Sequence, residues 1–277
     1  MRAFEKMHPV PCFLYFLTVI GFTIFSRDPV ILAESLIGAV TAAVLSEKSG
    51  AMPFLAVTAA AVTLTNPLFS HNGVTVLFFV GDLAITLEAL VYGLAFSAML
   101  CAAVLWGAVS ARFLTSDKYI WLFGRLLPSA GLVLSCAIRF VPLFAGRTRD
   151  FIKSRKAVTI REIAAAFSAS LSYSAEESMT TADSMRSRGY GTAKRTFYSS
   201  CRMTAGDIRA LAIVLVCGAA CLALSVCGAG RFYYYPAISA PKFDIANVAL
   251  YICFGVLCAL PTALIVHEEL KRAAIKE

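Results

Sequence analysis

Two short basic triplets are the residues of this chain whose types and spacing best suit the binding of another molecule. They are Ser154-Arg155-Lys156 and Ser187-Arg188-Gly189, and each follows a run of helix-forming residues. An arginine at the end of a stiff helix presents a planar, permanently charged guanidinium, which fits an acidic groove or the backbone carbonyls of a partner. The alternative is that both triplets simply lie on anionic lipid headgroups.

The segment between the triplets contains start signals for two helices. Thr159-Ile160-Arg161-Glu162 fits a capping box, in which a hydroxyl and a carboxylate satisfy free amides at a helix start. Ser174-Ala175-Glu176-Glu177 fits a second one. Together with residues Arg147 to Lys156, the pattern predicts three consecutive helical pieces.

Both of the capped helices have an apolar stripe, and the second has a stop signal. The stripes are Ile163, Phe167 and Leu171 at intervals of four, and Met179, Ala182 and Met185 at intervals of three. Cations in the last turn, such as Arg186, suit the helix dipole, and Gly189 suits the left-handed turn that ends a helix before Tyr190 and Gly191. The second triplet is therefore expected at the end of an ordered helix.

The composition indicates that these helices belong to a membrane protein. Of the 277 residues, 59% are hydrophobic and 15% are charged, and the mean hydropathy is +0.75, whereas soluble domains are about 25% charged. Apolar segments of roughly membrane thickness run over Val10 to Ser26, Pro29 to Leu45, Met52 to Phe69, Glu88 to Phe113, Phe123 to Phe144, Ile208 to Val226 and Val248 to Val266. A shorter segment, Val74 to Leu87, is broken by Gly81-Asp82.

The charge distribution places the loop with the triplets in the cytoplasm. The net charge is +8, and residues 146–209 contain 12 Lys and Arg against 6 Asp and Glu, so the positive-inside tendency explains the excess without nucleic acid as a partner. If both termini are also cytoplasmic, an even number of crossings must precede this loop. Counting Val74 to Leu87 as a short crossing or broken helix gives eight crossings, and an interfacial or re-entrant segment there or at the N-terminus gives six or seven.

We therefore expect an all-α protein of six to eight spans in three parts. These are N-terminal transmembrane helices over residues 1–145, cytoplasmic helices over 146–207, and C-terminal transmembrane helices with a short cytoplasmic tail over 208–277. Arg139 and Pro142 would lie at the junction between a span and the loop. Glu88 and Asp82 are expected at helix ends near water, where their charges have structural roles.

Four stretches of the chain resemble a known family, the transmembrane T component of energy-coupling factor (ECF) transporters. The most distinctive is Thr180 to Gly191, TTADSMRSRGYG, which resembles the Ala-x-x-x-Arg-Gly-Tyr/Phe helix end of that family. Arg139 to Leu143 is similar to its Arg-Phe-Ile/Val-Pro stretch, and Asn66 to His71 and Ile85 to Leu90 are also similar to it. With the order of spans and loop, the resemblance covers nearly the whole chain.

The resemblance implies a non-catalytic scaffold in the inner membrane of a prokaryotic cell. Its partners would be two cytoplasmic ABC ATPases and a small membrane subunit, the S component, which captures a vitamin or a transition-metal ion. Two coupling helices would insert Arg-centred triplets into the ATPases. Arg188 matches the second triplet, and Arg155 is assigned to the first, with Arg149 or Arg161 as the alternative, since both triplets have Ser where the family often has Ala.

Enzyme and cofactor motifs are absent from the sequence. It has no phosphate-binding Gly-x-x-x-x-Gly-Lys-Ser/Thr loop, no Gly-x-Ser-x-Gly and no His-Glu-x-x-His. Its three histidines have no metal-ligand spacing, and the nine cysteines form no Cys-x-x-Cys pair. We expect no enzyme activity, metal or cofactor, and the alternatives to a T component are a permease with its own substrate pocket and, third, an unfamiliar membrane enzyme.

Overall fold

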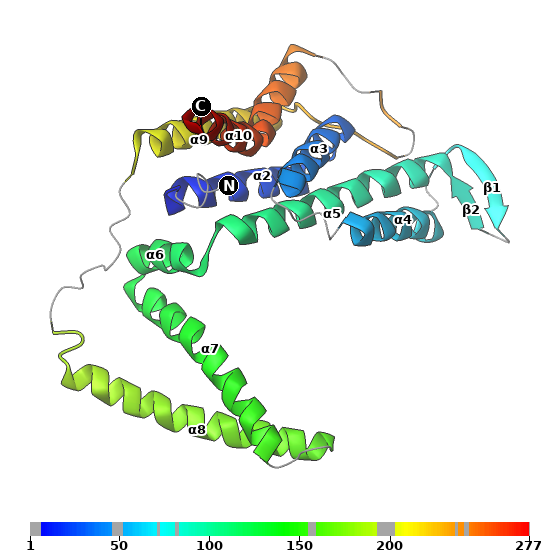
Figure 1. Cartoon of the computed structure of the whole chain (residues 1–277). Coiled ribbons are helices and arrows are strands. Elements are labelled where there is room, and N and C mark those ends of the chain that lie inside the picture. Colours follow the sequence, from blue (N-terminus) through cyan, green and yellow to red (C-terminus); the bar gives the residue numbers. More distant parts are fainter. Residues whose placement is uncertain are drawn as a thin grey trace. The chain divides into compact units, whose positions relative to one another are not determined.

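The computed structural model describes residues 7–45, 52–70, 73–80, 83–154, 159–192, 203–235, 238–240 and 244–276. The chain divides into two compact units. The first consists of Met1–Thr115 and Arg202–Glu277, and the second of Ser116–Cys201. The protein is predominantly helical, as the sequence predicts, with one small β-hairpin (Figure 1).

The first unit contains six helices and the hairpin among its described residues. In chain order these are α2 (Pro9–Phe25), α3 (Pro29–Leu45), α4 (Met52–Phe69), β1 (Val76–Val80), β2 (Leu83–Thr86), α5 (Leu87–Phe113), α9 (Ala205–Val226) and α10 (Ile245–Lys276). The long helix α5 packs against α2, α3 and α4, while α10 packs against α3 and α9. Because α2 also packs against α9, helices from both ends of the chain share this unit.

A buried network links four helices at the centre of the first unit. The indole Nε1 of Trp106 donates to Ser35 Oγ at 3.2 Å, and Ser35 Oγ lies 2.7 Å from Thr23 Oγ1. The Tyr15 ring stands edge-on to Trp106, with centroids 6.1 Å apart, and its hydroxyl donates to the Leu257 carbonyl at 3.1 Å. All four of these polar groups are satisfied, which is what burial in an apolar core requires.

Helix starts and ends meet at one end of the first unit. The backbone N–H of His8, just before α2, donates to Asp207 Oδ1 in the first turn of α9 at 3.2 Å. Phe16 of α2 stacks on Phe113 in the last turn of α5, with ring centroids 6.3 Å apart. The beginning of α2, the end of α5 and the beginning of α9 therefore lie at the same end.

Three segments lie near one another at the opposite end: the turn between α2 and α3, the end of α4 and the segment after α9. Tyr234 donates its hydroxyl hydrogen to the Arg27 carbonyl at 2.9 Å. Ser70 Oγ, just after α4, donates to the Tyr235 hydroxyl at 3.1 Å. These bonds place the connections at residues 26–28, 70 and 227–235 together.

The structure contains a hairpin where we expected a short helical crossing. The strands β1 (Val76–Val80) and β2 (Leu83–Thr86) pair antiparallel, with Val80 opposite Leu83. Strands of 5 and 4 residues reach only about 17 Å at ~3.3 Å per residue, short of a ~30 Å hydrocarbon core. The β-branched and aromatic residues of this segment favour strands, and Glu88 holds its start by accepting from Thr75 N and Oγ1 at 3.1 and 2.6 Å.

Four helices in the described part of the chain are long and apolar enough to cross a bilayer. They are Leu87–Phe113, Ser129–Ser154, Ala205–Val226 and Ile245–Ala263. Three further apolar helices, Pro9–Phe25, Pro29–Leu45 and Leu55–Phe69, are shorter, and 17 residues extend about 26 Å at 1.5 Å per residue. The structure thus agrees with a membrane protein.

The second unit consists of three helices: α6 (Ser116–Leu126), α7 (Pro128–Ser154) and α8 (Ile160–Ser187). A break at Leu127 separates α6 from α7, so the expected span from Phe123 to Phe144 is divided between two helices, and the expected boundary after residue 145 falls inside α7. The capping box at Ser174 is wrong, because α8 continues through it without interruption. The two helical pieces predicted on either side of Ser174 therefore form a single helix, Ile160–Ser187.

Candidate coupling site

The C-terminal end of α8 stops in an ordered turn that presents the second triplet. Gly189 has φ +78°, and its N–H donates to the Arg186 carbonyl at 3.0 Å. The Tyr190 N–H reaches back to the Met185 carbonyl at 3.0 Å. This pair of bonds is a Schellman motif, which satisfies free carbonyls at a helix end and favours glycine at the left-handed position.

The side chains of this helix end face solvent. Arg186, Ser187, Arg188 and Tyr190 are all exposed, and within the described residues neither arginine has an ion-pair partner. Gly191 follows with φ +93°, so the backbone turns away after Tyr190. Two unpaired guanidiniums and a phenol ring on a fixed helix end form a surface suited to an acidic partner.

The first triplet falls mostly outside the described residues. Ser154 is the last residue of α7, and its hydroxyl donates to the Phe151 carbonyl at 3.1 Å, whereas Arg155 and Lys156 lie outside that range. Both alternatives are exposed: Arg149 is near the end of α7 and Arg161 is in the first turn of α8. The assignment of Arg155 to the first triplet stays a prediction.

The start of α8 is capped as its sequence predicts. Thr159 and Glu162 form the reciprocal capping box, in which the Thr159 N–H donates to the Glu162 carboxylate at 3.1 Å. Because this box and the Schellman motif fix opposite ends, α8 is a defined rod of 28 residues, about 42 Å long at 1.5 Å per residue.

Contacts of three chemical kinds join α7 to α8 (Figure 1). The Phe144 and Phe167 rings meet edge to face with centroids 5.4 Å apart. One turn further along α7, the hydroxyls of Thr148 and Ser170 lie 2.6 Å apart. An aromatic pair and a shared hydrogen bond on neighbouring turns set the register of the two helices.

The third contact is an ion pair supported by an aromatic ring. The Arg147 guanidinium donates to the Glu177 carboxylate and lies 4.9 Å from the centroid of the Tyr173 ring. The hydrogen bond from Arg147 lowers the pKa of Glu177 below its ordinary value, and the charge of Arg139 lowers it further. Both side chains are partly exposed, 25% for Arg147 and 35% for Glu177, so the pair orders the helices more than it stabilises them.

Arg139 and Pro142 lie in the middle of α7 rather than at a junction between a helix and a loop. Pro142 is inside the helix, which continues from Pro128 to Ser154. The helix therefore does not end where we expected the span to give way to the loop. Arg139 is exposed on α7. The structure therefore makes α7 one helix that is apolar in its first half and basic in its second.

Of the residues that join α7 to α8, the predicted apolar stripe contains Phe167, which contacts Phe144, but not Ser170 or Glu177. The expected apolar stripe of α8 is largely exposed, at 41% for Ile163, 50% for Phe167 and 55% for Leu171. The buried positions facing α7 are instead Ala166 and Ser170. The spacing of four between these two small residues is a sequence signal for such a contact, since small side chains let helices approach closely.

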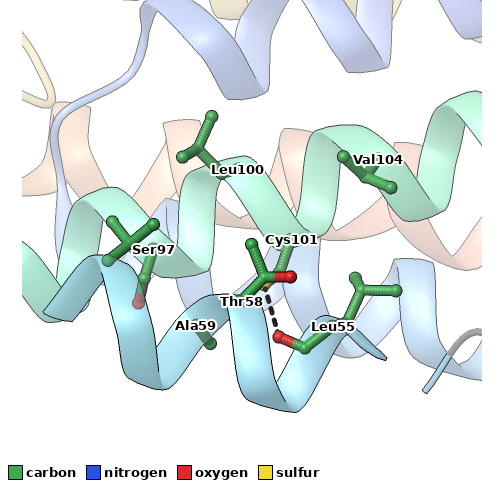
Figure 2. A pocket seen from close by; sticks show the side chains of 8 residues that line it. Leu55, Thr58, Ala59, Ser97, Leu100, Cys101 and Val104 are labelled. Atoms are coloured by element: carbon green, nitrogen blue, oxygen red, sulfur yellow. Dashed lines mark hydrogen bonds between the residues drawn. The ribbon is translucent and has the colours of Figure 1, made fainter. Parts of the chain in front are cut away.

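A hollow that could hold a small molecule lies between α4 and α5 (Figure 2). Its empty volume is about 300 Å³, and its polar groups are Thr58, Ser97 and Cys101. The Cys101 thiol donates to the Leu55 carbonyl at 3.6 Å, and none of the lining residues is charged. This hollow has no charged group to pair with a charged cargo, and the described part of the chain holds no cluster of three metal-ligating side chains.

Comparison with known proteins found no match for this chain, neither among protein-family models nor among curated proteins.

Proposed function

We propose that this chain is the T component of an ECF-type importer, the membrane scaffold that transmits ATP-driven movement to a separate substrate-capture subunit. The observation that supports it most is the end of α8, where a capped helix, fixed against α7, presents Arg186 and Arg188 unpaired. An ABC ATPase pair supplies the energy, and an S component binds the vitamin or metal ion. The chain itself hydrolyses nothing.

In this proposal six helices cross the inner membrane: α2, α3, α4, α5, α9 and α10. The hairpin and the connections at residues 26–28 and 227–235 then lie outside the cell, and the hydrogen bonds among these connections support a common side. Both termini and α6 to α8 lie in the cytoplasm. Four crossings then precede the basic segment, which is the even number that cytoplasmic termini require. The segment begins on the inner side because α5 ends there.

The helix α7 is long and apolar enough to cross a membrane, but the charge of Arg139 opposes such a crossing. The residue is 11 positions after the start of α7, about 16 Å along the helix axis, which is the centre of a bilayer. An arginine there costs about 2.5–3.5 kcal/mol. An α7 that lies along the membrane or against a partner leaves this charge in water.

The mechanism follows from the stiffness of the α7–α8 pair. Closure of the two ATPases on ATP displaces the guanidiniums held in their grooves. Since the Arg147–Glu177 pair, the Thr148–Ser170 bond and the Phe144–Phe167 contact oppose sliding, α7 and α8 move as one body. That movement reaches whichever membrane protein packs on the exposed apolar side chains of α8, including Met179, which is 72% exposed.

Purification of the full chain from its native membrane in mild detergent tests the proposal. The wild type should retain two ATPase subunits with Walker A loops, identical or distinct, together with ATPase activity. Arg188→Glu should reduce both by about tenfold or more, because a buried interface arginine contributes at least ~2 kcal/mol. Arg209→Glu, on the first turn of α9, is the matched control and should change neither.

Retention of the same ATPase by Arg188→Glu and the wild type would rule out this role for the α8 end. Sidedness is tested separately with single cysteines at Ser168 and Ser178 in a cysteine-free chain. Both are exposed, so an impermeant maleimide should label them only after cells are opened. Labelling in intact cells would overturn the cytoplasmic position of α8.

A further inference from the structure

A second hollow of the first unit lies between the turn that joins α2 to α3 and the loop that follows α9. Its empty volume is about 630 Å³. Two arginines line it, Arg27 from the turn and Arg231 from the loop, together with the hydroxyl residues Ser26 and Ser225. No acidic residue lines the hollow, so its local charge is +2.

Neither guanidinium is neutralised by the described part of the chain. The acidic neighbour of Arg27 is Asp28, and its carboxylate is occupied elsewhere: Oδ2 accepts from the Tyr251 hydroxyl at 2.7 Å, and Oδ1 accepts from the Val30 N–H at 3.0 Å. Asp28 is only 4% exposed. The Asp28 carboxylate is therefore directed to Val30 and Tyr251 and not to either arginine.

The loop that carries Arg231 is fixed by its backbone. Gly228 has φ +99°, and the Arg231 Cζ lies 3.7 Å from the point where a Cβ of residue 228 would be. Gly230 has φ +72°, and its N–H donates to Asn247 Oδ1 at 2.9 Å. The loop is therefore fixed to α10 and lets the guanidinium fold back over a residue without a side chain.

The other wall is fixed as well. The Arg27 carbonyl accepts the hydroxyl hydrogen of Tyr234 at 2.9 Å, so the turn and the loop that form the two walls are bonded to each other. Phe232, which is 8% exposed, supplies an apolar floor. The cationic groups thus project from a constrained frame.

The rim of the hollow is apolar and faces outward. Phe25 is 87% exposed and Tyr233 is 62% exposed, and both line it. Aromatic side chains of this kind concentrate at the interface of a bilayer, at the level of the headgroups. A soluble anion needs no such rim, whereas a lipid places its phosphate on the cations and its glycerol and acyl carbons along the rings.

We propose that this hollow binds one anionic phospholipid, with Arg27 and Arg231 donating to the phosphate and with Phe25 and Tyr233 beside the acyl chains. A guanidinium donates two parallel hydrogen bonds to phosphate oxygens, and two of them carry more charge than one phosphodiester. A headgroup of the phosphatidylglycerol type, which has no cation of its own, therefore binds better than phosphatidylcholine, whose choline would lie beside the arginines.

Native mass spectrometry of the full chain in mild detergent tests this site. The wild type, mixed with equal amounts of palmitoyl-oleoyl phosphatidylglycerol and phosphatidylcholine, should retain one phosphatidylglycerol at least tenfold more often than phosphatidylcholine. The double variant Arg27→Gln/Arg231→Gln should lose this preference. Arg209→Gln removes an exposed arginine at the other end of α9 and should keep it, as should Arg188→Glu, so the result is independent of ATPase coupling.

A thermal-shift series separates the lipid from a free anion. Phosphatidylglycerol should raise the melting temperature of the wild type more than phosphatidylcholine or inorganic phosphate at the same concentration. Equal retention of the two lipids by the wild type would overturn the proposal, as would equal protection by inorganic phosphate. An unchanged preference in the double variant would also overturn it, and the two wild-type comparisons decide the matter if that variant does not fold.

Discussion

The Arg147 guanidinium of α7 pairs with the Glu177 carboxylate of α8 while its face rests 4.9 Å from the centre of the Tyr173 ring. Tyr173 and Glu177 are four residues apart on α8, so one turn of that helix supplies both partners. A single side chain of α7 is thereby held from two directions, and the angle between the helices depends on it.

Acid should weaken the contact between α7 and α8. Arg147 lowers the pKa of Glu177 in the folded protein below its ordinary value of 4.5, so the pair stabilises the fold fully above that value and is lost as the pH falls through the lowered pKa. Hydrogen exchange of the α8 amides should therefore increase relative to Glu177→Gln controls only below about pH 4.5. An equal ratio of wild type to variant at pH 7 and at a pH below the lowered pKa of Glu177 would contradict this expectation.

A disulfide between α7 and α8 should leave transport intact. The hydroxyl oxygens of Thr148 and Ser170 are 2.6 Å apart, so Thr148→Cys/Ser170→Cys in a cysteine-free chain should crosslink under mild oxidation. If the pair moves as one body, transport by the oxidised protein should stay within about twofold of the reduced protein. Loss of transport that dithiothreitol restores would show that the helices slide during the cycle.

Replacement of Gly189 should loosen the end of α8. Alanine at φ +78° costs roughly 1–2 kcal/mol of left-handed strain, so Gly189→Ala should increase hydrogen exchange at Tyr190 and weaken ATPase retention. Gly146→Ala is the control, because it lies inside α7 with nothing within 4 Å of the added methyl group. A change in ATPase retention as large for the control as for Gly189→Ala would argue against a role for the Schellman turn.

Loss of the Tyr251 hydroxyl should destabilise the first unit more than loss of the Tyr234 hydroxyl. Tyr251 donates to the buried carboxylate of Asp28, whereas Tyr234 donates to the Arg27 carbonyl. Removing a donor from a charged acceptor costs roughly 1.5–3 kcal/mol, against about 0.5–1.5 kcal/mol for a neutral one. Melting temperatures of Tyr251→Phe and Tyr234→Phe in the same detergent measure the difference, and a reversed order would contradict this expectation.

The local features of α8 could be predicted from the sequence because their causes are local. Thr159 with Glu162, and Gly189 after a basic turn, determine hydrogen bonds within four residues, and the structure has both. Ser174 fits the same capping pattern, yet a capping box is used only where the preceding residues cannot stay helical. The residues from Ala169 to Tyr173 contain no Gly or Pro that would end a helix, so α8 continues.

The hairpin and the α7–α8 contacts could not be predicted because their causes are distant. Val76 to Val80 is apolar at every position, a pattern that a short strand and a membrane segment share. What fixes the strand is pairing with residues 83–86 and the anchoring of Thr75 by Glu88. The Thr148–Ser170 bond likewise depends on how α7 crosses α8, which periodicity along either helix does not specify.

The hydrogen bond from His8 to Asp207 spans 199 residues, and this separation matters while the protein is being made. At roughly 5–20 residues per second, a ribosome needs about 10 to 40 s to reach α9 after α2 has emerged. During that interval α2 lacks the neighbour that completes its packing, while all of the second unit is synthesised. The N-terminal helix therefore completes its packing only when the nascent chain delivers α9, so truncation after residue 202 should leave α2 without this partner and reduce the yield of folded protein.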